Sequence, residues 1–557
     1  MTRQRPARDG TEKGAAIDYD AIIIGAGIAG MYQLYRLREM GLCIRVYEAG
    51  TGIGGTWYWN RYPGCRFDSE SYSYGYSFSD ELLQEWDWSE HFAAQPETLR
   101  YLNHVADKFG LRRDIQFESR VSKAHYDDTN ECWNVELESG EKASARFLIS
   151  ATGPLSAPQM PVIDGIDDFV GETYHTALWP RDPDGFGGRK DITFDGKRVG
   201  VIGTGATAVQ LIQEVARTAG ELFVYQRTPN WCAPLHNKPI SPEEQRRIKE
   251  SYADIFRRCN ETFGGFLHGM VRESALDVSP EEREAFFEKL YAEPGFGIWL
   301  GNYFDTMTDQ RANDLLSEFI ANKIRQRVKD PVVAEKLIPK NHGFGTRRVP
   351  METNYYEVYN QDNVTLVDIA ASPIERITPT GIRTGEAAYE LDMIIYATGF
   401  DAVMGALNRI DIRGEGGQVL KDKWADGPST YLGMQTAGFP NFFTLVGPHN
   451  GATFCNIPRC IEQNVEWVTD AIRYMREHGY EHIEATRAAE ERWTKHVDET
   501  AARTLFPTAD SWFMGINQNI PGRQKRRFLL YAGGAPAYRE KCDDVAANGY
   551  DGFVFRR

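Results

Sequence analysis

The stretch Ala21-Ile-Ile-Ile-Gly-Ala-Gly-Ile-Ala-Gly30 decides the fold class of this 557-residue chain. Its apolar first half is typical of a buried parallel strand. Gly25, Gly27 and Gly30 follow at once, and a helical pattern then runs from Met31 to Met40. A glycine-rich turn that opens a helix binds the pyrophosphate of a dinucleotide, because the first N–H groups of the helix are free to meet an anion. The sequence therefore predicts a Rossmann-like unit here.

Each part of this unit has its own physical role. Gly25 permits the tight turn, Gly27 lets the backbone approach the pyrophosphate, and Gly30 lets the helix pack closely on the strand. The next predicted strand, Arg45-Val-Tyr-Glu48, ends in an acid. Glu48 can accept hydrogen bonds from ribose hydroxyls. A glycine-rich turn without a ligand is the alternative, and the combination of strand, helix and acid favours nucleotide binding.

A second unit of the same type follows the apolar strand Lys197–Ile202. The positions that we expect to contact its nucleotide are Gly203, Gly205, Thr207 and Ala208. The next strand, Phe223–Gln226, is followed by Arg227 where an NAD site carries an acid. A guanidinium binds a 2′-phosphate through charge-assisted hydrogen bonds, and Thr228 adds a hydroxyl donor. We therefore expect NADPH here, with a solvent-facing arginine as the alternative.

Bulk properties narrow the class of protein further. The length predicts about two or three domains, and the net charge of −16 argues against a nucleic-acid partner. No apolar run is long enough to span a membrane, and residues 1–17 form a polar leader that we expect to be disordered. Eight scattered cysteines do not indicate a disulfide framework. We expect a cytoplasmic protein that is a monomer or a weak homo-oligomer, and we assign no metal ligand.

Two longer patterns resemble those of one enzyme family. Phe169–Pro180, between the two glycine-rich loops, reads Phe-x-Gly-x3-His-x3-Trp-Pro. This resembles the fingerprint of the Baeyer–Villiger monooxygenases, flavoenzymes that insert oxygen next to a ketone carbonyl. Gly54–Asp68 is similar to a second signature of that family, Gly-Gly-x-Trp-x4-Tyr-Pro-Gly-x3-Asp, with every defined position filled. Its glycines, proline and aromatic residues favour a rigid loop over a helix, with a self-packed surface loop as the alternative.

The resemblance implies FAD at the first glycine-rich loop and NADPH at the second. Ala151-Thr-Gly153 and Ala397-Thr-Gly399 resemble the two segments, here called the Ala-Thr-Gly returns, at which the chain of such flavoproteins crosses from one domain to the other. On the flavin side, the resemblance assigns cofactor contacts to Gly55, Thr56, Trp57 and Asp68. It also places the Asp68 carboxylate near an active-site arginine, although such an acid is otherwise most often a turn or capping residue.

That arginine belongs to Asn341-His-Gly-Phe-Gly-Thr-Arg-Arg348, which by itself could be a basic surface loop. Similarity to the family pattern Gly-Thr-(Lys/Arg)-Arg implies two separate roles. Arg347 joins Arg227 at the 2′-phosphate, and Arg348 lies over the flavin. Arginine stays charged at any working pH, so Arg348 can stabilise the C4a-peroxyflavin anion and then the oxyanion of the ketone adduct.

Three further segments have expected roles that rest on the resemblance. Trp512 matches a mobile loop that approaches the nicotinamide cofactor, with a core or interface tryptophan as the alternative. Pro448–Pro458 is expected to line the substrate pocket. His175 and Trp179 define the fingerprint, and we expect His175 to hold the linker geometry by hydrogen bonds and not to act as a base.

The predicted fold is α/β, with two Rossmann-like dinucleotide-binding domains and a helical insert. Residues 18–152 and 397–557 form the expected FAD-binding domain, and 153–234 and 340–396 the NADPH-binding domain. Residues 235–339 form the insert, where Ser241 and Ser279 each precede Pro-Glu-Glu and predict helix starts. The apolar face of one of its helices is predicted to comprise Leu315, Leu316, Phe319, Ile320, Ile324 and Val328.

The predicted function is a flavin-dependent oxidation of a bulky or cyclic ketone to an ester or lactone, with NADPH and O2. The first alternative is a flavin-containing N- or S-oxygenase, a family that lacks the arginine loop and has Tyr or Phe in place of Trp179-Pro180. A disulfide reductase, suggested by Cys455-x4-Cys460, disagrees with the position of that pair. A non-catalytic flavin-bound redox sensor is the third alternative.

Overall fold

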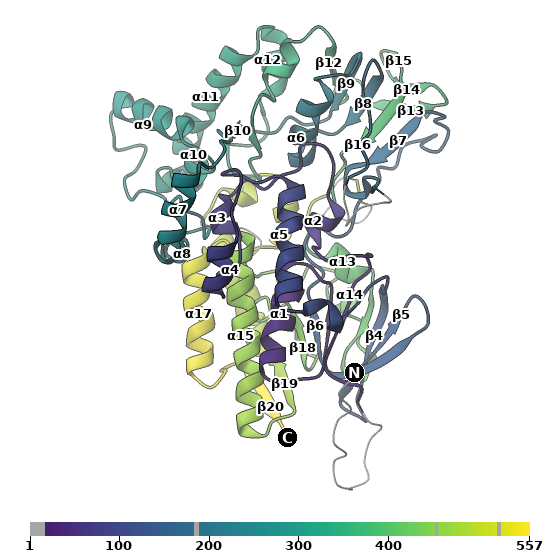
Figure 1. Cartoon of the computed structure of the whole chain (residues 1–557). Coiled ribbons are helices and arrows are strands. Elements are labelled where there is room, and N and C mark those ends of the chain that lie inside the picture. Colours follow the sequence, from purple (N-terminus) through teal and green to yellow (C-terminus); the bar gives the residue numbers. More distant parts are fainter. Residues whose placement is uncertain (1–16, 183–188, 452–454, 518, 521–524) are drawn as a thin grey trace.

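Two separate sheets organise the chain in the computed structural model, which describes residues 17–182, 189–451, 455–517, 519–520 and 525–557. The leader 1–16 lies outside the described residues. In Figure 1 the eight-stranded sheet lies in the lower half to the right of the long helices, the five-stranded sheet lies at the upper right, helices α9–α11 lie at the upper left, and α12 lies at the top. This mixed α/β architecture with parallel sheet cores confirms the predicted fold class.

The eight-stranded sheet has the order β17-β4-β5-β6-β1-β2-β3, and β18 also pairs with β6. Its strands are β1 (Tyr19–Ile24), β2 (Ile44–Tyr47), β3 (Ile115–Gln116), β4 (Val121–Asp127), β5 (Cys132–Leu137), β6 (Lys142–Ser150), β17 (Asp411–Arg413) and β18 (Phe442–Thr444). Ile24 is in register with both Tyr47 and Ser150. Three parallel strands therefore end at one edge, where the first glycine-rich loop begins.

The five-stranded sheet is parallel throughout, in the order β12-β9-β8-β16-β7. Its strands are β7 (Glu172–His175), β8 (Arg198–Ile202), β9 (Glu221–Gln226), β12 (Val364–Asp368) and β16 (Met393–Tyr396). A three-stranded antiparallel sheet, β13 (Ile374–Thr378), β14 (Gly381–Thr384) and β15 (Ala388–Glu390), lies beside it. The fingerprint segment thus supplies the edge strand β7.

The helices between and around the sheets follow the capping signals of the sequence. The segment from 235 to 339 contains α7 (Pro242–Glu250), α8 (Tyr252–Glu261), α9 (Pro280–Ala292), α10 (Gly297–Leu300), α11 (Gln310–Arg327) and α12 (Pro331–Leu337). Ser241 and Ser279 cap α7 and α9, and Ser279 forms a full capping box. The predicted apolar face of α11 is buried except at Leu315, which is 36% exposed because it lies at the edge of that face.

The C-terminal part returns to the eight-stranded sheet. Its longest helix, α15 (Ile457–His478), packs along α1 (Ile28–Glu39), and α17 (Ala535–Ala547) packs on α15 (Figure 1). Other elements here are α13 (Gly405–Asn408), α14 (Leu420–Lys423), α16 (Arg487–Ala501), β19 (His482–Ala485) and β20 (Phe553–Arg556). The predicted domain limits stay a prediction, which the strand membership of the two sheets supports.

Four helices follow the first glycine-rich unit before β3 is reached. They are α2 (Thr56–Trp59), α3 (Ser71–Tyr74), α4 (Asp80–Glu85) and α5 (Gln95–Lys108). The prediction that Gly54–Asp68 is loop throughout is therefore wrong at α2, where the backbone N–H groups of Trp59 and Asn60 bond to Gly55 and Thr56 carbonyls. A single helical turn forms at Thr56–Trp59 because Gly54 and Gly55 adopt positive φ values, which let the chain reverse direction before the helix.

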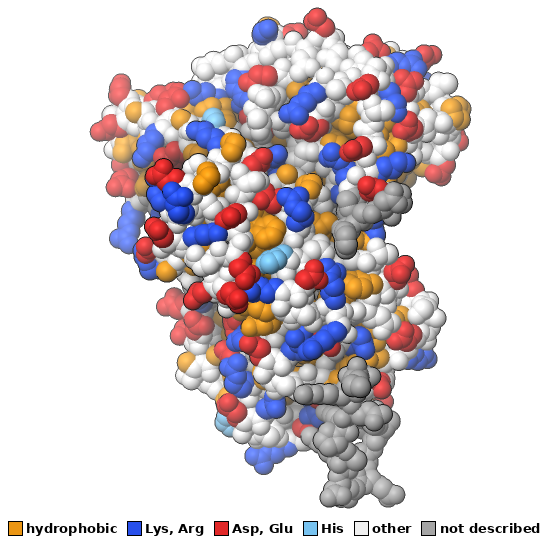
Figure 2. Space-filling model, in the orientation of Figure 1, with side chains coloured by type: hydrophobic (Ala, Val, Ile, Leu, Met, Phe, Trp, Pro, Cys, Tyr) orange, Lys and Arg blue, Asp and Glu red, His pale blue; other side chains and the backbone are white. Residues whose placement is uncertain are grey.

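The outer surface carries charges of both signs. On the face shown in Figure 2, Lys and Arg side chains are interspersed with Asp and Glu, and apolar side chains form small separate groups. Within the part of the chain that is described, no helix combines the length and the apolar character needed to cross a membrane.

Candidate active site

The two glycine-rich loops are packed in the same way. Gly25 has φ +105°, and a Cβ there would lie 2.6 Å from the Ala151 carbonyl oxygen. Gly203 has φ +113°, and a Cβ there would lie 2.5 Å from the Ala397 carbonyl oxygen. Each Ala-Thr-Gly return therefore contacts one nucleotide loop, and neither glycine tolerates a side chain. A Cβ on Gly30 would overlap the Gly25 carbonyl oxygen, which keeps α1 tight against β1.

Both loops leave the first N–H groups of a helix without a side-chain cap. Gly27 is the N-cap of α1 and Gly205 is the N-cap of α6 (Ala206–Val215), and neither cap makes a side-chain hydrogen bond. A Cβ on Gly205 would meet no atom within 4 Å, so the space in front of α6 is open. Uncapped N–H groups facing open space fit a phosphate, so the second loop fits a dinucleotide.

Glu48 ends β2 beside the first loop and is 4% exposed. Its Oε2 accepts the Ala26 N–H at 2.8 Å, and its Oε1 accepts the Gly50 N–H at 2.7 Å. Burial raises the pKa of Glu48, and these two N–H donors act in the opposite direction. The carboxylate therefore holds the loop backbone in place, a role that the sequence did not indicate.

One cavity of about 1180 Å³ connects the second nucleotide loop with the segment Thr56–Ser69. The sequence-predicted residues that line it are Thr56, Trp57, Asp68, Gly203, Gly205, Thr207, Arg227, Thr228, Arg347, Arg348 and Trp512. The predicted residues that do not line it are Gly25, Gly27, Gly30, Glu48, Gly55 and Ala208. The residues that line the cavity follow strands of both sheets or belong to the C-terminal loop. The fold therefore brings together residues that are far apart in the sequence.

Arg227 and Arg347 form a pair of neighbouring cations at this cavity. Neither has an acidic partner among the described residues; Arg227 donates to Asn519 Oδ1 at 3.0 Å, and Arg347 Nε is buried without a hydrogen-bond partner. Burial and the positive charge of Arg227 lower the pKa of Arg347. Two like charges held together without an acid fit an anion with several oxygens, such as a phosphate.

Asp68 and Arg348 form an ion pair at the cavity wall. Arg348 Nη2 lies 2.7 Å from Asp68 Oδ2, and the side chains are 34% and 1% exposed. The Met351 N–H donates to the same oxygen at 3.2 Å. The buried carboxylate therefore fixes one end of the guanidinium, while the exposed part of that group faces the cavity.

Packing and hydrogen bonds hold Trp57 in the cavity wall. Trp57 is 5% exposed, packs edge-on against Phe67, and donates its Nε1–H to the Tyr74 hydroxyl at 3.1 Å. The Trp57 carbonyl also accepts the side-chain amide of Gln95. This network makes Trp57 a rigid part of the cavity lining next to Thr56.

The fingerprint residues lie outside the cavity. His175 Nδ1 accepts the Ala177 N–H at 3.1 Å, and His175 Nε2 lies 3.5 Å from the Thr398 hydroxyl. Burial lowers the pKa of His175, which favours the neutral form that these contacts require. Trp179 is 2% exposed and packs on Tyr174. His175 therefore joins the β7 linker to the second Ala-Thr-Gly return.

The C-terminal segments close one side of the cavity. Trp512 and Phe513 line it, and the Asn517 side chain donates to the Phe400 carbonyl at 3.0 Å. The predicted mobility of this loop stays a prediction, and residues 518 and 521–524 lie outside the described residues. Of the predicted pocket segment 448–458, residues 452–454 are also outside them, while Cys455 and Ile457 line the cavity.

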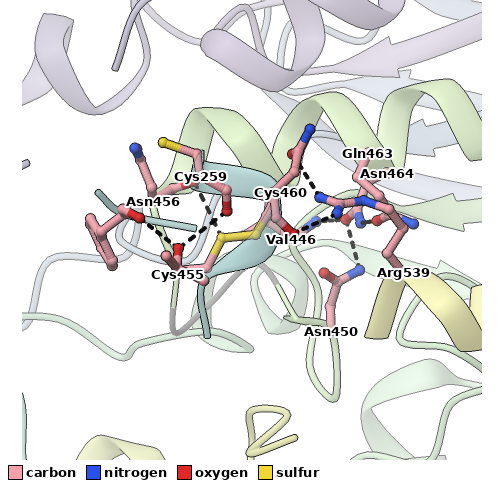
Figure 3. Close-up of a disulfide and its surroundings, with 12 residues drawn as sticks. Cys259, Val446, Asn450, Cys455, Asn456, Cys460, Gln463, Asn464 and Arg539 are labelled. Atoms are coloured by element: carbon pink, nitrogen blue, oxygen red, sulfur yellow. Dashed lines mark hydrogen bonds between the residues drawn. A yellow bond between two sulfur atoms is a disulfide. The ribbon is translucent and has the colours of Figure 1, made fainter. Parts of the chain in front are cut away.

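The cysteine pair at this wall differs from the expectation. Cys455 and Cys460 form a disulfide at the start of α15 (Figure 3), and the other six cysteines are not disulfide-bonded. The sequence raised this pair only as that of a disulfide reductase, which its position argues against, and a structural bridge was not predicted because the pairing depends on where the helix starts. Asn456 caps α15, so Cys460 lies one turn into the helix and the two Cα atoms are 6.6 Å apart, within the range of a disulfide.

Two groups that contact Asp68 were not predicted from the sequence. They are the side-chain amide of Gln210 on α6 and the backbone N–H of Met351. Asp68 and these residues are separated by more than a hundred positions, and no local pattern links them. Only the packing of α6 on the segment Tyr62–Asp68 reveals the contact.

The chain is similar to known proteins over most of its length. Residues 19–239 match the model of the flavin-binding monooxygenase-like family. The chain is 53% identical to 2-oxo-Delta(3)-4,5,5-trimethylcyclopentenylacetyl-CoA monooxygenase of Pseudomonas putida, covering 96% of this chain and 98% of that one. It is 43% identical to a Baeyer–Villiger monooxygenase of Pseudooceanicola batsensis, covering 97% of each. A crystal structure of OTEMO in complex with FAD and NADP superposes with a TM-score of 0.94 at 52% identity, covering 97% of this chain and 100% of that one.

Proposed function

The chain belongs to the Baeyer–Villiger monooxygenases of the flavin-binding monooxygenase-like family, and we propose that it uses FAD, NADPH and O2 to oxidise a bulky or cyclic ketone to an ester or lactone. The relative from Pseudomonas putida is named for a cyclic ketone, which supports this substrate class. A monomer or weak oligomer and a cytoplasmic location stay predictions.

The observation that carries the proposal is the Asp68–Arg348 ion pair at a cavity shared with the NADPH loop. Asp68 belongs to the segment Thr56–Ser69 and Arg348 to the segment 341–348, so the pair forms only when the fold brings these two segments together. A permanent cation at this position stabilises negative charge that develops on oxygen, and a buried carboxylate fixes its direction. Amine or sulfide oxygenation needs no such cation.

The proposed roles of the residues follow from their positions. The first loop and Glu48 bind the dinucleotide part of FAD, and Gly55, Thr56 and Trp57 contact its flavin end. Bound reduced flavin supplies the electrons that activate O2. Gly203, Gly205, Thr207 and Ala208 bind the NADPH pyrophosphate, and Arg227, Thr228 and Arg347 bind its 2′-phosphate.

With flavin bound, the Arg348 guanidinium would supply a permanent positive charge to oxygen atoms that become negative during the reaction, while Asp68 orients it. Trp512 excludes water from the nicotinamide side of the cavity. The direction of insertion is proposed to follow migration of the more substituted carbon.

The test is a panel of small, aromatic, steroidal and macrocyclic ketones with flavin-loaded protein, NADPH and O2. Product mass should increase by one oxygen atom relative to the ketone, and one NADPH should be consumed for each ester. An amine and a sulfide in the same panel test the N- or S-oxygenase alternative. Oxidation of those two without ester formation from any ketone would contradict the proposal, and NADPH use that no substrate stimulates would favour a redox sensor.

A further inference from the structure

Gln210 connects the NADPH-side helix to the active-site carboxylate. It lies on α6, and its amide faces the segment Tyr62–Asp68. Its Oε1 accepts the Tyr62 hydroxyl at 2.8 Å and the Arg66 N–H at 3.4 Å. Its Nε2 donates to the Arg66 carbonyl at 3.1 Å and to Asp68 Oδ1 at 3.4 Å. A side-chain amide has two acceptor and two donor positions, so every position of Gln210 is used on this one segment.

The backbone of the same segment also packs directly on α6. Gly64 has φ +80°, and a Cβ there would lie 2.7 Å from the Gln210 carbonyl oxygen. No side chain separates the Tyr62–Gly64 turn from the helix. Because the backbone of this turn contacts the backbone of α6 directly, a displacement of α6 should also displace the segment that carries Asp68.

Asp68 depends on such contacts because its side chain is 1% exposed. Its Oδ2 accepts from Arg348 and from the Met351 N–H, and Gln210 approaches Oδ1. A buried carboxylate turns toward whichever donors surround it, since water cannot satisfy its remaining lone pairs. The Gln210 amide therefore restricts rotation of the carboxylate that orients Arg348.

We propose that Gln210 is a positioning residue for oxygen insertion, which holds Asp68 against Arg348 and links that pair to the helix that starts at the NADPH loop. This inference rests on the proposed function. Gln210 lines the cavity, but its amide bonds only to the segment Tyr62–Asp68. Its loss should therefore lower the share of activated oxygen that reaches the ketone more than it slows reduction of the flavin by NADPH.

The experiment compares Gln210→Met, Gln210→Glu and the control Gln213→Met in flavin-loaded protein. Methionine keeps the volume of glutamine and removes all four hydrogen bonds. Glutamate keeps the acceptor for the Tyr62 hydroxyl, removes the donor to Asp68 and adds a second negative charge beside it. Gln213 lies on the same helix and is also partly buried, but its amide bonds to Val209, Thr353 and Asn354.

Two measurements are made on each variant. The first is ester formed per NADPH consumed, which should fall about three- to tenfold in Gln210→Met, the loss expected for one ordinary hydrogen bond, because the contact to Asp68 is long at 3.4 Å. Gln210→Glu should lose at least as much, whereas the rate of flavin reduction without O2 should stay within about twofold of the unmodified protein. The second is amide exchange of segment 349–352 without substrate, which should become faster because the Met351 N–H bonds to Asp68.

The outcomes separate the possible roles of Gln210. Near-normal ester yield in Gln210→Glu with a loss in Gln210→Met would show that the Tyr62 contact matters and overturn the proposal. An equal loss in Gln213→Met would show a general effect of α6 and overturn it too. If the unmodified protein forms no ester from any ketone, the proposed function fails, and unchanged exchange at 349–352 in both Gln210 variants would independently reject the positioning role.

Discussion

Removing the positive charges at the NADPH loop should change the preference between NADPH and NADH. Arg227 and Arg347 line the cavity without an acidic partner among the described residues, so the positive charge of each is available to a 2′-phosphate. The phosphate is the only group that distinguishes the two cofactors. Alanine at either position should weaken NADPH binding and leave NADH binding nearly unchanged.

The two arginines should contribute unequally. A hydrogen bond to a charged group is worth about 1.5–3 kcal/mol, and burial moves the value toward the upper limit. Arg227 is exposed and also bonds to Asn519, so its loss should cost about 1.5 kcal/mol, or about tenfold in affinity. Arg347 is half-buried with a buried Nε, so its loss should cost about 3 kcal/mol, or about a hundredfold.

The assay is the apparent KM for NADPH and NADH, together with equilibrium titration of NADP⁺ and NAD⁺, for Arg227→Ala, Arg347→Ala and the double variant. Added salt should reduce the effect of Arg227 more than that of Arg347, because exposed charges are screened more strongly. Equal losses for both cofactors in either single variant would refute the assignment of that arginine to the 2′-phosphate.

Three more outcomes follow from the site. Arg348→Ala should still be reduced by NADPH but form no ester and release hydrogen peroxide instead, and retained ester formation would remove Arg348 from the mechanism. Burial lowers the pKa of His449 to about 4, so the unfolded chain takes up the proton first on acidification. The contribution of His449 to the free energy of unfolding should therefore fall by about 1.6 kcal/mol from pH 6.5 to 5, so the loss of stability over this range should be smaller in His449→Asn than in the unmodified protein. Alkylation before reduction should label the exposed Cys43 and leave Cys455 and Cys460 unmodified; labelling of either would contradict the bridge.

Local patterns predicted the nucleotide-binding units well because each role is confined to a few adjacent residues. Gly25 and Gly203 adopt positive φ values that favour glycine, and strand, turn and helix follow one another without an insertion. Ser279 and Glu282 form a capping box for the same reason, since both partners belong to one helical turn. Family resemblance then supplied the cofactors and the reaction type, which spacing alone does not specify.

Predictions failed where an outcome depends on neighbours in space. Leu315 belongs to the predicted apolar face of α11 but is exposed, because the spacing of apolar residues does not show how far the neighbouring elements cover that face. The segment Gly54–Asp68, predicted as a loop, contains the short helix Thr56–Trp59. The bonds from Glu48 to Ala26 and Gly50 were not predicted, and the expected contact of Glu48 with a ribose stays a prediction.

The sequence by itself determined the α/β class, the two nucleotide loops and the identity of the charged groups, because periodicity and turn chemistry act over a few residues. Family resemblance placed Asp68 near Arg348, but only the tertiary structure decided that the two form an ion pair with a buried carboxylate and that Gln210 contacts that carboxylate. The physical reason is that a carboxylate, a guanidinium and an amide attract each other strongly only within a few ångströms and away from water. That proximity is created by the packing of α6 on the segment Tyr62–Asp68, between residues that no local pattern connects.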